Sequence, residues 1–288
     1  MRDELCSVCN SKMNLGLQSW HWECARCKYE KSTLSQAINE TLAHEKINEL
    51  SREKGLKSIR VENFNKLLKS IKALGKKTGN LLDVGCAHGW FIEAAEKQGF
   101  KVLGIEPDVN VYNATAQRGL PVRNGFFPQV LSSSEKFDVI VFNDVFEHIP
   151  DVADILNKCR SHLNPDGQLI LNLPSSTGIF YRISKVLAGR GYKGFFERLW
   201  QKGLPSPHLH YFNTRNLSKL LQDNGFEVIS TGSLTTLRAK GMFTRISYAG
   251  NHSLPIRLLI YILLILVVPF LYLMPSDIIY LISKKVED

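Results

Sequence analysis

Short apolar runs recur along the central part of the chain, and most of them are followed by a stretch with helical spacing. The clearest runs lie at residues 81–84, 102–105, 139–142 and 168–173. Runs of this length that are apolar on both faces are typical of buried parallel strands. A short strand at 120–123 and an antiparallel pair, at 226–230 and near 244–248, would bring the total to seven. Strands that alternate with helices predict an α/β fold with a doubly wound sheet.

The pattern also divides the chain into four parts. A cysteine-bearing module at 1–32 is followed by a helical linker at 33–55, a central domain at 56–250 and an apolar tail at 251–288. Two amphipathic helices are predicted ahead of the sheet, at 35–54 and 56–74. The second carries a firm apolar stripe at Phe64, Leu67, Leu68, Ile71 and Leu74.

A glycine-containing turn joins the first strand to the helix that follows it. Gly85 and Gly89 stand in this turn, where exposed backbone N–H groups can cradle the polar part of a nucleotide-like ligand. A plain strand-to-helix turn would need the same glycines. Glu106 ends the second strand, and a carboxylate at that position can accept hydrogen bonds from both hydroxyls of a ribose. We therefore expect a nucleotide-like ligand at this edge of the sheet.

Four motifs follow one another along the chain: Asp83-Val-Gly-Cys-Ala-His-Gly89, Gly104-Ile-Glu-Pro-Asp108, the stretch from Phe137 to Pro150 containing Glu-His-Ile, and the Pro-Asp-Gly turn within 163–171. Together they resemble the motifs of class I methyltransferases that use S-adenosylmethionine (SAM). A nicotinamide dehydrogenase would share only the first two. The resemblance covers about residues 56–250 and implies a seven-stranded Rossmann-like methyltransferase sheet.

The resemblance also implies which residues hold SAM. Ala87 stands where the family usually has its middle glycine, and Asn124 where it usually has an acid near the adenine. An amide can still hydrogen-bond the adenine amine. The implied cofactor-binding residues are Asp83, Gly85, Cys86, Ala87, Gly89, Glu106, Pro107, Asn124, Phe126, Asn143 and Asp144.

Two histidines are candidates for the base that removes a proton from the methyl acceptor. His210 lies in a His-Leu-His-Tyr-Phe run that resembles methyltransferases of surface-glycan biosynthesis, and His148 follows the fourth strand. Imidazole titrates near neutral pH, which suits it to this role. For Glu147 and His148, capping of the loop before the next helix is an equally good interpretation. We predict that His210 is the catalytic base and keep His148 as the second candidate.

Four cysteines near the start predict a metal site. Cys6 and Cys9 form one Cys-x-x-Cys pair, and Cys24 and Cys27 form a second pair fourteen residues later. The pattern resembles a zinc ribbon, in which four thiolates bind a structural Zn²⁺ and allow a very short module to fold. Disulfides and rubredoxin-like iron are the alternatives. Such a ribbon would act as a structural clip or as a docking site for a protein partner that the sequence does not identify.

An insertion at 175–212 is longer than the fold needs and is rich in aromatic and basic residues. Insertions at this position form the acceptor lid in related enzymes. Aromatic residues beside cations suit a membrane interface or a diphosphate group. They would also suit nucleic acid.

The apolar tail predicts membrane attachment. Residues 258–274 contain no charge, a second apolar patch lies at 278–282, and basic residues flank both sides. The positive-inside tendency favours a re-entrant hairpin at Pro269 over a single membrane helix, with contact through about 255–283. The net charge of +9 also favours anionic partners. Without a visible signal peptide, the expected location is the cytoplasmic face of a membrane.

The sequence therefore predicts a SAM-dependent methyltransferase that O-methylates a hydroxyl of a sugar, a lipid-linked glycan precursor or another membrane-associated small molecule. A quinone-ring O-methyltransferase is the second enzymatic reading, since its acceptor is also membrane-bound. An RNA methyltransferase that grips its substrate with the ribbon is a third, against which the apolar tail argues. A SAM-binding protein without catalysis would use the ribbon and tail for docking.

Overall fold

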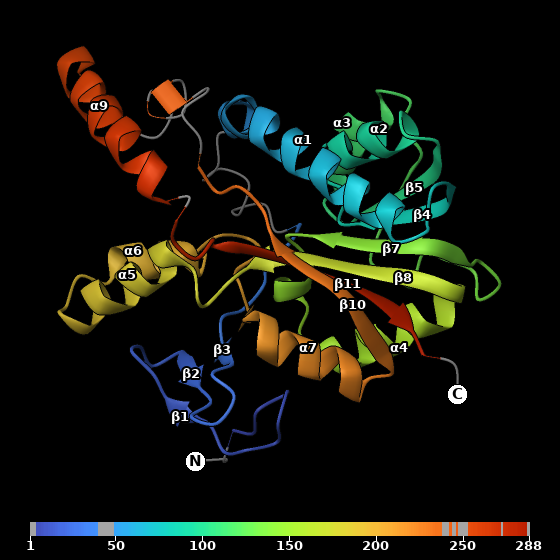
Figure 1. Ribbon diagram of the computed structural model, residues 1–288, viewed down its shortest axis with the longest axis horizontal. Coiled ribbons are helices and arrows are strands. Elements are labelled where there is room, and N and C mark those ends of the chain that lie inside the picture. Colours follow the sequence, from blue (N-terminus) through green and yellow to red (C-terminus); the bar gives the residue numbers. More distant parts are fainter. Residues whose placement is uncertain are drawn as a thin grey trace.

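A computed structural model describes residues 4–39, 49–237, 242–243, 246, 253–271 and 273–286. Its centre is a seven-stranded sheet with the order β10-β11-β8-β7-β4-β5-β6 (Figure 1). Neighbouring strands from β6 to β8 run parallel, and β11 runs antiparallel to both of its neighbours. The strands are β4 (Gly79–Val84), β5 (Phe100–Glu106), β6 (Val122–Asn124), β7 (Phe137–Asn143), β8 (Leu163–Pro174), β10 (Phe226–Ser233) and β11 (Ile278–Lys285). The predicted doubly wound α/β sheet is confirmed.

Helices cover both faces of this sheet (Figure 1). One face carries α1 (Glu49–Ala73), α2 (Trp90–Glu96) and α3 (Val109–Ala116), and the other carries α4 (Val152–His162) and α7 (Thr214–Asp223). Residues Phe64, Leu67, Leu68 and Ile71 of α1 are buried in one cluster with the sheet. This confirms the helical stripe expected at 56–74. The helix expected at 35–54 differs, since residues 35–39 are not helical and 40–48 lie outside the described residues.

The cysteine-bearing module is not separate from the central domain. Its strands β1 (Asn14–Leu15), β2 (His21–Glu23) and β3 (Glu30–Ser32) form a second sheet that also includes β9 (His210–Tyr211), in the order β1-β2-β3-β9. β9 comes from the end of the predicted lid. The module is thus hydrogen-bonded to the lid through a shared sheet.

The insertion at 175–212 folds as α5 (Ile179–Gly189), α6 (Gly194–Leu199) and β9. Several of its aromatic residues, which we expected near an acceptor or a membrane, face the cysteine-bearing module instead. Tyr181, Phe196 and Trp200 are fully buried in a cluster that Trp20 and Leu34 also contact. Among the exposed aromatic residues is Tyr192, at 72%.

The C-terminal region corrects two expectations. The apolar patch at 278–282 is part of β11, which lies between β8 and β10 and is buried there because the sheet needs an apolar central strand. It is therefore not the second arm of a membrane hairpin. The strand expected near 244–248 falls outside the described residues except for Ile246, and β11 is the seventh strand instead. The apolar run before it forms α9 (Leu254–Leu271). No helix in the described part of the chain is both long and apolar enough to span a membrane.

Candidate active site

A cavity of about 660 Å³ opens at the carboxyl ends of β4, β5 and β7. Open α/β sheets bind ligands at this edge, and the volume lies in the usual range for small-molecule sites. Eight of the thirteen residues that the sequence placed in the cofactor or catalytic site line it: Gly85, Ala87, Glu106, Pro107, Phe126, Asn143, Asp144 and His148. Most of the predicted site is therefore brought together in one place.

The turn after β4 depends on backbone conformations that favour glycine. Gly85 and Gly89 both have φ of +70°, and a Cβ on either would lie 2.5 Å from a side-chain carbon, of Val145 and Leu120 respectively. Ala87 has φ of +45°, also in the left-handed region. An L-residue there costs roughly 1–2 kcal/mol relative to the right-handed conformation. The turn tolerates the departure from the family pattern at Ala87 but holds it in a strained conformation.

Glu106 is held by the same turn. Its carboxylate accepts the backbone N–H of Ala87 and the backbone N–H of Asp108, each at 2.9 Å. Burial raises the pKa of Glu106 to about 7, although these two N–H groups act in the opposite direction. A carboxylate has lone pairs beyond those two bonds. Glu106 lines the cavity and can still accept ribose hydroxyls.

The remaining predicted cofactor residues support the turn from outside the main cavity. Asp83 and Cys86 border a small adjoining pocket of about 30 Å³. Asp83 accepts a hydrogen bond from Asn143 at 3.3 Å, and burial raises its pKa to about 8. Asn124 donates to the carbonyl oxygen of Glu106 at 2.9 Å. Its amide therefore fixes the backbone at the end of β5, where the sequence suggested contact with adenine.

His148 lies in the cavity wall in a defined tautomer. Its Nδ1 lies 2.9 Å from the carbonyl oxygen of Pro207, which can only accept a hydrogen bond. In the neutral ring Nδ1 therefore carries the proton, and Nε2 keeps the lone pair that a base requires. The carbonyl of His148 accepts a hydrogen bond from the Gln36 side chain at 2.6 Å.

His210 occupies a different environment. It is 1% exposed and is not among the residues that line the cavity. Nδ1 is hydrogen-bonded to the Tyr29 hydroxyl, and Nε2 lies 2.8 Å from the Ile149 carbonyl oxygen. Burial lowers the pKa of His210 to about 4. The structure therefore gives His210 a supporting position and leaves His148 as the candidate base.

Several lining residues were missed from the sequence. Gln36 and Ile38 come from the segment after the cysteine-bearing module, and Arg60 of α1 pairs with Asp144 at 3.2 Å. Gln201 and Pro205 come from the end of the insertion. Among these residues, only the pairing of Arg60 with Asp144 could have been suspected from the sequence, because the two side chains carry opposite charges. Even so, that prediction would have required knowing that α1 crosses this edge of the sheet.

Glu147 lies next to the cavity wall and is 1% exposed. In the described part of the chain neither of its carboxylate oxygens has a hydrogen-bond partner. Burial, followed by the charge of Asp144, raises its pKa well above the usual range. Glu147, His148 and His208 each place one ligand atom within 4.8 Å of the other two, so a cation could be held here.

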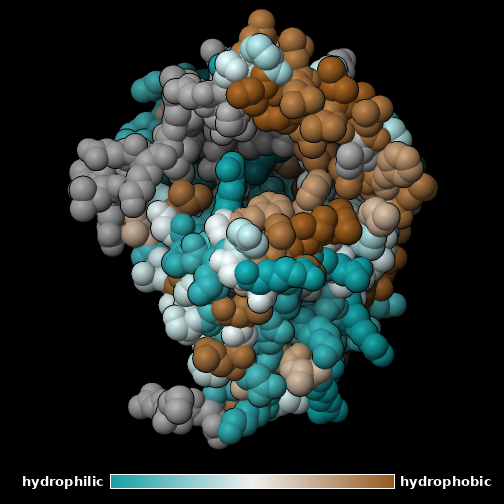
Figure 2. Space-filling view, turned by 90° about the vertical axis from the view of Figure 1, so that its left-hand side faces the viewer, coloured by the Kyte–Doolittle hydropathy of each residue, from teal (hydrophilic) through white to brown (hydrophobic). Residues whose placement is uncertain are grey.

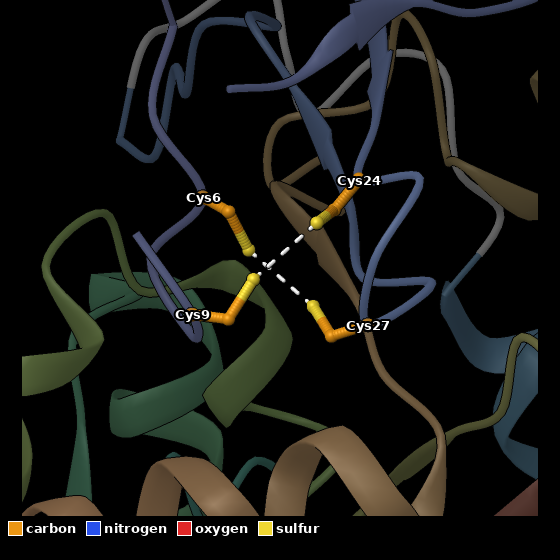
Figure 3. Close-up of side chains that lie close together, drawn as sticks. All are labelled: Cys6, Cys9, Cys24 and Cys27. Carbon is orange, nitrogen blue, oxygen red and sulfur yellow. Dashed lines mark hydrogen bonds between the residues drawn. The ribbon is translucent and has the colours of Figure 1, made fainter. Parts of the chain in front are cut away.

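The four cysteines of the N-terminal module point toward a common centre (Figure 3). The Sγ atoms of Cys6 and Cys27 lie 3.5 Å apart, as do those of Cys9 and Cys24, and all four lie within 4.8 Å of one another. Four thiolates around a zinc ion with ~2.3 Å bonds would be about 3.8 Å apart. The residues therefore fit a tetrahedral metal site of the zinc-ribbon kind.

The match to a known protein family identifies the class of protein in which this cavity lies. Residues 57–231 match the model of a methyltransferase domain, which is more than half of the chain. The chain belongs to this methyltransferase family. The cavity of this methyltransferase is lined by Glu106 and by residues of the glycine turn, which belong to the motifs in which the sequence resembles SAM-dependent methyltransferases.

Curated relatives give further context for the methyltransferase. It is 26% identical over 162 residues to the mitochondrial ubiquinone biosynthesis O-methyltransferase of Bos taurus, which covers 51% of this chain and 41% of that protein. It is 33% identical over 165 residues to the ubiquinone biosynthesis O-methyltransferase of Histophilus somni, which covers 51% of this chain and 67% of that protein. The chain thus spans less than half of the first relative's length.

Solved structures agree on the fold. A SAM-dependent methyltransferase from Thermotoga maritima superposes with a TM-score of 0.53 at 16% identity, over 84% of this chain and 97% of that one. Magnesium protoporphyrin IX methyltransferase from Synechocystis PCC 6803, with bound SAH, superposes with a TM-score of 0.51 at 15% identity, over 83% and 89% of the two chains. At these identities the likeness establishes the methyltransferase fold alone.

Proposed function

We propose that this methyltransferase transfers the methyl group of SAM to a hydroxyl of an amphiphilic aromatic acceptor of the quinone-ring type. The observation that carries the proposal is His148, which presents a basic Nε2 in the same cavity as the glycine turn and Glu106. The similarity to ubiquinone biosynthesis O-methyltransferases supports an aromatic O-acceptor. They therefore favour this acceptor over the sugar or glycan hydroxyl that the sequence first suggested.

The cavity suits SAM on its own geometry. Gly85 lines the cavity, and a Cβ there would collide with Val145, so the turn requires glycine at this position. Glu106 offers acceptor lone pairs to a ribose, and Phe126, 53% exposed, offers a ring face to an adenine. When bound, SAM supplies an electrophilic methyl group on a positively charged sulfur.

The chain's own residues then supply alignment and proton transfer. During the transfer, Nε2 of His148 would accept the proton of the acceptor hydroxyl. The imidazolium that forms is stabilised because Nδ1–H donates to the Pro207 carbonyl. Positioning and base catalysis contribute most to such a transfer.

We also propose that the enzyme meets its acceptor at a membrane surface through α9. Along one side of this helix, Leu259, Leu263, Leu266 and Phe270 are 54–65% exposed and follow the three- and four-residue spacing of a single face. The opposite side packs on Met242 and Ile246. Apolar residues gather at the top of the face in Figure 2, where α9 lies. A helix that is apolar all round needs a second apolar environment.

The charges near α9 favour an anionic lipid surface. The helix contains one arginine and no acidic residue. Residues 179–196 around α5 contain no acidic residue and three basic residues besides Lys185, whose charge is paired with Glu23 and Glu30. The start of α5 is hydrogen-bonded to the segment after α9, from Ile179 N–H to the Pro275 carbonyl at 3.1 Å. Apolar area with cations beside it is typical of helices that lie in the membrane interface.

The acceptor is tested by incubating metal-loaded enzyme and methyl-labelled SAM with a prenylated catechol, a polyprenyl-linked sugar or RNA. We expect a labelled methyl group on the catechol oxygen with the wild-type enzyme, and much less labelled product with the His148→Asn variant. Labelling of the sugar or RNA instead would overturn the acceptor assignment. Absence of SAM binding by calorimetry would overturn the function itself.

The membrane face is tested by sedimentation with vesicles of phosphatidylglycerol and phosphatidylcholine. Replacing Leu259 and Leu263 by serine should lower vesicle binding by at least about tenfold, because buried apolar area sets interfacial affinity. Leu15→Ser, at an exposed leucine of the N-terminal module, is the matched control. Equal binding of both variants would contradict the proposed face.

A further inference from the structure

We propose that the four-cysteine module positions the acceptor side of the active site, with Tyr29 and Glu30 as the residues that transmit its position to His148 and the insertion. The inference rests on the proposed function only in taking His148 as the base. It assigns the metal-binding module a role beyond clipping the N-terminus in place.

The first connection is a shared strand pair. In β3, Glu30 pairs with Tyr211 and Lys31 with His210. The pairing continues at Ser32, whose backbone N–H donates to the Leu209 carbonyl at 2.8 Å. The Ser32 hydroxyl donates to the His208 carbonyl at 2.7 Å. Residues 208–211 therefore take their position from the module.

The second connection runs through His210 to the loop that holds His148. The Ile149 carbonyl can only accept, so Nε2 of His210 carries the proton and Nδ1 accepts from the Tyr29 hydroxyl. On the other side of His148, the Glu147 carbonyl accepts the Leu209 N–H at 2.9 Å. Both neighbours of His148 are thus bonded to the strand that the module pairs with.

The third connection is direct. Gln36, four residues beyond β3, donates its side-chain N–H to the His148 carbonyl at 2.6 Å. Asn39 donates to the Pro107 carbonyl at 2.9 Å and accepts the Val109 N–H at 3.2 Å. The segment after the module therefore passes from the loop of His148 to the end of β5, and Gln36 lines the cavity on the way.

Glu30 ties the module to the insertion through buried charge. Its carboxylate, in a residue 5% exposed, is hydrogen-bonded by His21 at 2.8 Å, by the Tyr181 hydroxyl at 2.5 Å and by Lys185 at 3.0 Å. Lys185 also pairs with Glu23 at 2.8 Å. Burial opposes ionisation, but the His21 and Lys185 contacts outweigh it and lower the pKa of Glu30. A buried charge satisfied from two modules disfavours their separation.

The metal site lies immediately before these groups. Cys27 precedes Tyr29 by two residues, and the Cys24 N–H donates to the Tyr29 carbonyl at 2.8 Å. A module of this size gains much of its folding free energy from bound metal. Loss of the metal would therefore release Tyr29 and Glu30, and with them the strand that holds the loop of His148.

The experiment uses Tyr29→Phe, which removes one hydroxyl, with Tyr192→Phe at an exposed position of the insertion as its control. We expect Tyr29→Phe to lower kcat for a prenylated catechol by about tenfold, because His210 then loses the hydrogen bond that orients it toward the Ile149 carbonyl beside His148. The KM for SAM, the calorimetric affinity for SAH and the metal content should stay within about twofold. A fall in kcat without a change in cofactor binding would show that Tyr29 positions the acceptor side. General destabilisation would lower both kcat and cofactor affinity.

Hydrogen exchange tests the same coupling without any acceptor. Removing the metal with a chelator should speed exchange of the amides of Leu209 and Ile149 by more than about tenfold, while amides of β4 and β5 and the affinity for SAH stay close to their metal-loaded values. Unchanged exchange at Leu209 and Ile149 would overturn the proposal. So would an equal loss of protection throughout the sheet, because it would show that the metal supports the whole fold.

Discussion

The cofactor side and the acceptor side of this active site are built in different ways. On the proposed cofactor side, one turn and one strand end line the cavity, and the conformations of Gly85 and Gly89 shape the backbone of that turn. On the acceptor side, His148 and its neighbour Ile149 are held by residues 36, 207 and 210, which lie far from them in the sequence. A local site can be read from a motif, whereas an assembled one depends on tertiary structure.

The largest effect expected on the acceptor side comes from His148→Asn. Asparagine can still donate to the Pro207 carbonyl but cannot take up the acceptor proton. We expect kcat to fall roughly 10²- to 10⁴-fold, the range that general base catalysis contributes. SAH affinity, measured by calorimetry, should not change. A variant with full kcat would show that His148 is not the base.

The matching change on the cofactor side is Glu106→Ala. It removes the carboxylate that accepts the backbone N–H groups of Ala87 and Asp108 and that we propose as the acceptor for the ribose hydroxyls. Affinity for SAM should fall about 10- to 100-fold, as expected for charge-assisted hydrogen bonds of about 1.5–3 kcal/mol. Glu135→Ala is the control, since Glu135 pairs with Arg123 outside the cavity. Comparable losses in both variants would point to general unfolding.

The pH dependence of binding should also separate the two sides. Burial raises the pKa of Glu106 to about 7, so this residue is ionised at pH 8 and mostly protonated at pH 6. Ribose hydroxyls donate to the ionised form, so SAM affinity should fall as the pH decreases, by about tenfold over this range. Calorimetry on Glu106→Gln should show a flat profile. A wild-type profile as flat would remove Glu106 as the ribose acceptor.

The smallest expected effect concerns Ala87, with φ of +45°. Ala87→Gly should relieve left-handed strain, partly offset by the greater entropy of glycine in the unfolded chain. We expect thermal unfolding to show a stabilisation of up to about 1 kcal/mol, with SAM affinity retained. A loss of stability would mean that the Ala87 methyl group makes contacts worth more than the strain.

The same difference explains what the sequence could predict. The alternation of apolar runs and helices predicted strands β4 to β8, and Glu106 and Gly85 were found because their contacts are local. His210 lies outside the cavity, where Tyr29 and Ile149 hold it, and both of these partners are distant from it in the sequence. Gln36 gave no signal at all, since its role depends on where the chain passes after β3.

The C-terminal region shows the limit of reading apolar runs. Ile278 to Ile282 has the composition of a membrane segment and of a central strand alike, and only its pairing with β8 and β10 distinguishes them. The length of this run did not distinguish the two interpretations, because the run is short and follows the longer apolar helix α9. The strand predicted near 244–248 left residues 278–282 outside the sheet, whereas β11 completes it.

The position of β11 has a consequence for biosynthesis. Because it inserts between β8 and β10, a nascent chain that has not yet exposed residues 278–285 presents two unpaired strand edges at once. Open edges recruit other strands, so the interval before β11 leaves the ribosome is when this protein is most prone to aggregate. Shortened chains that stop before Ile278 would remain in that state, and chaperone capture during translation should be concentrated there.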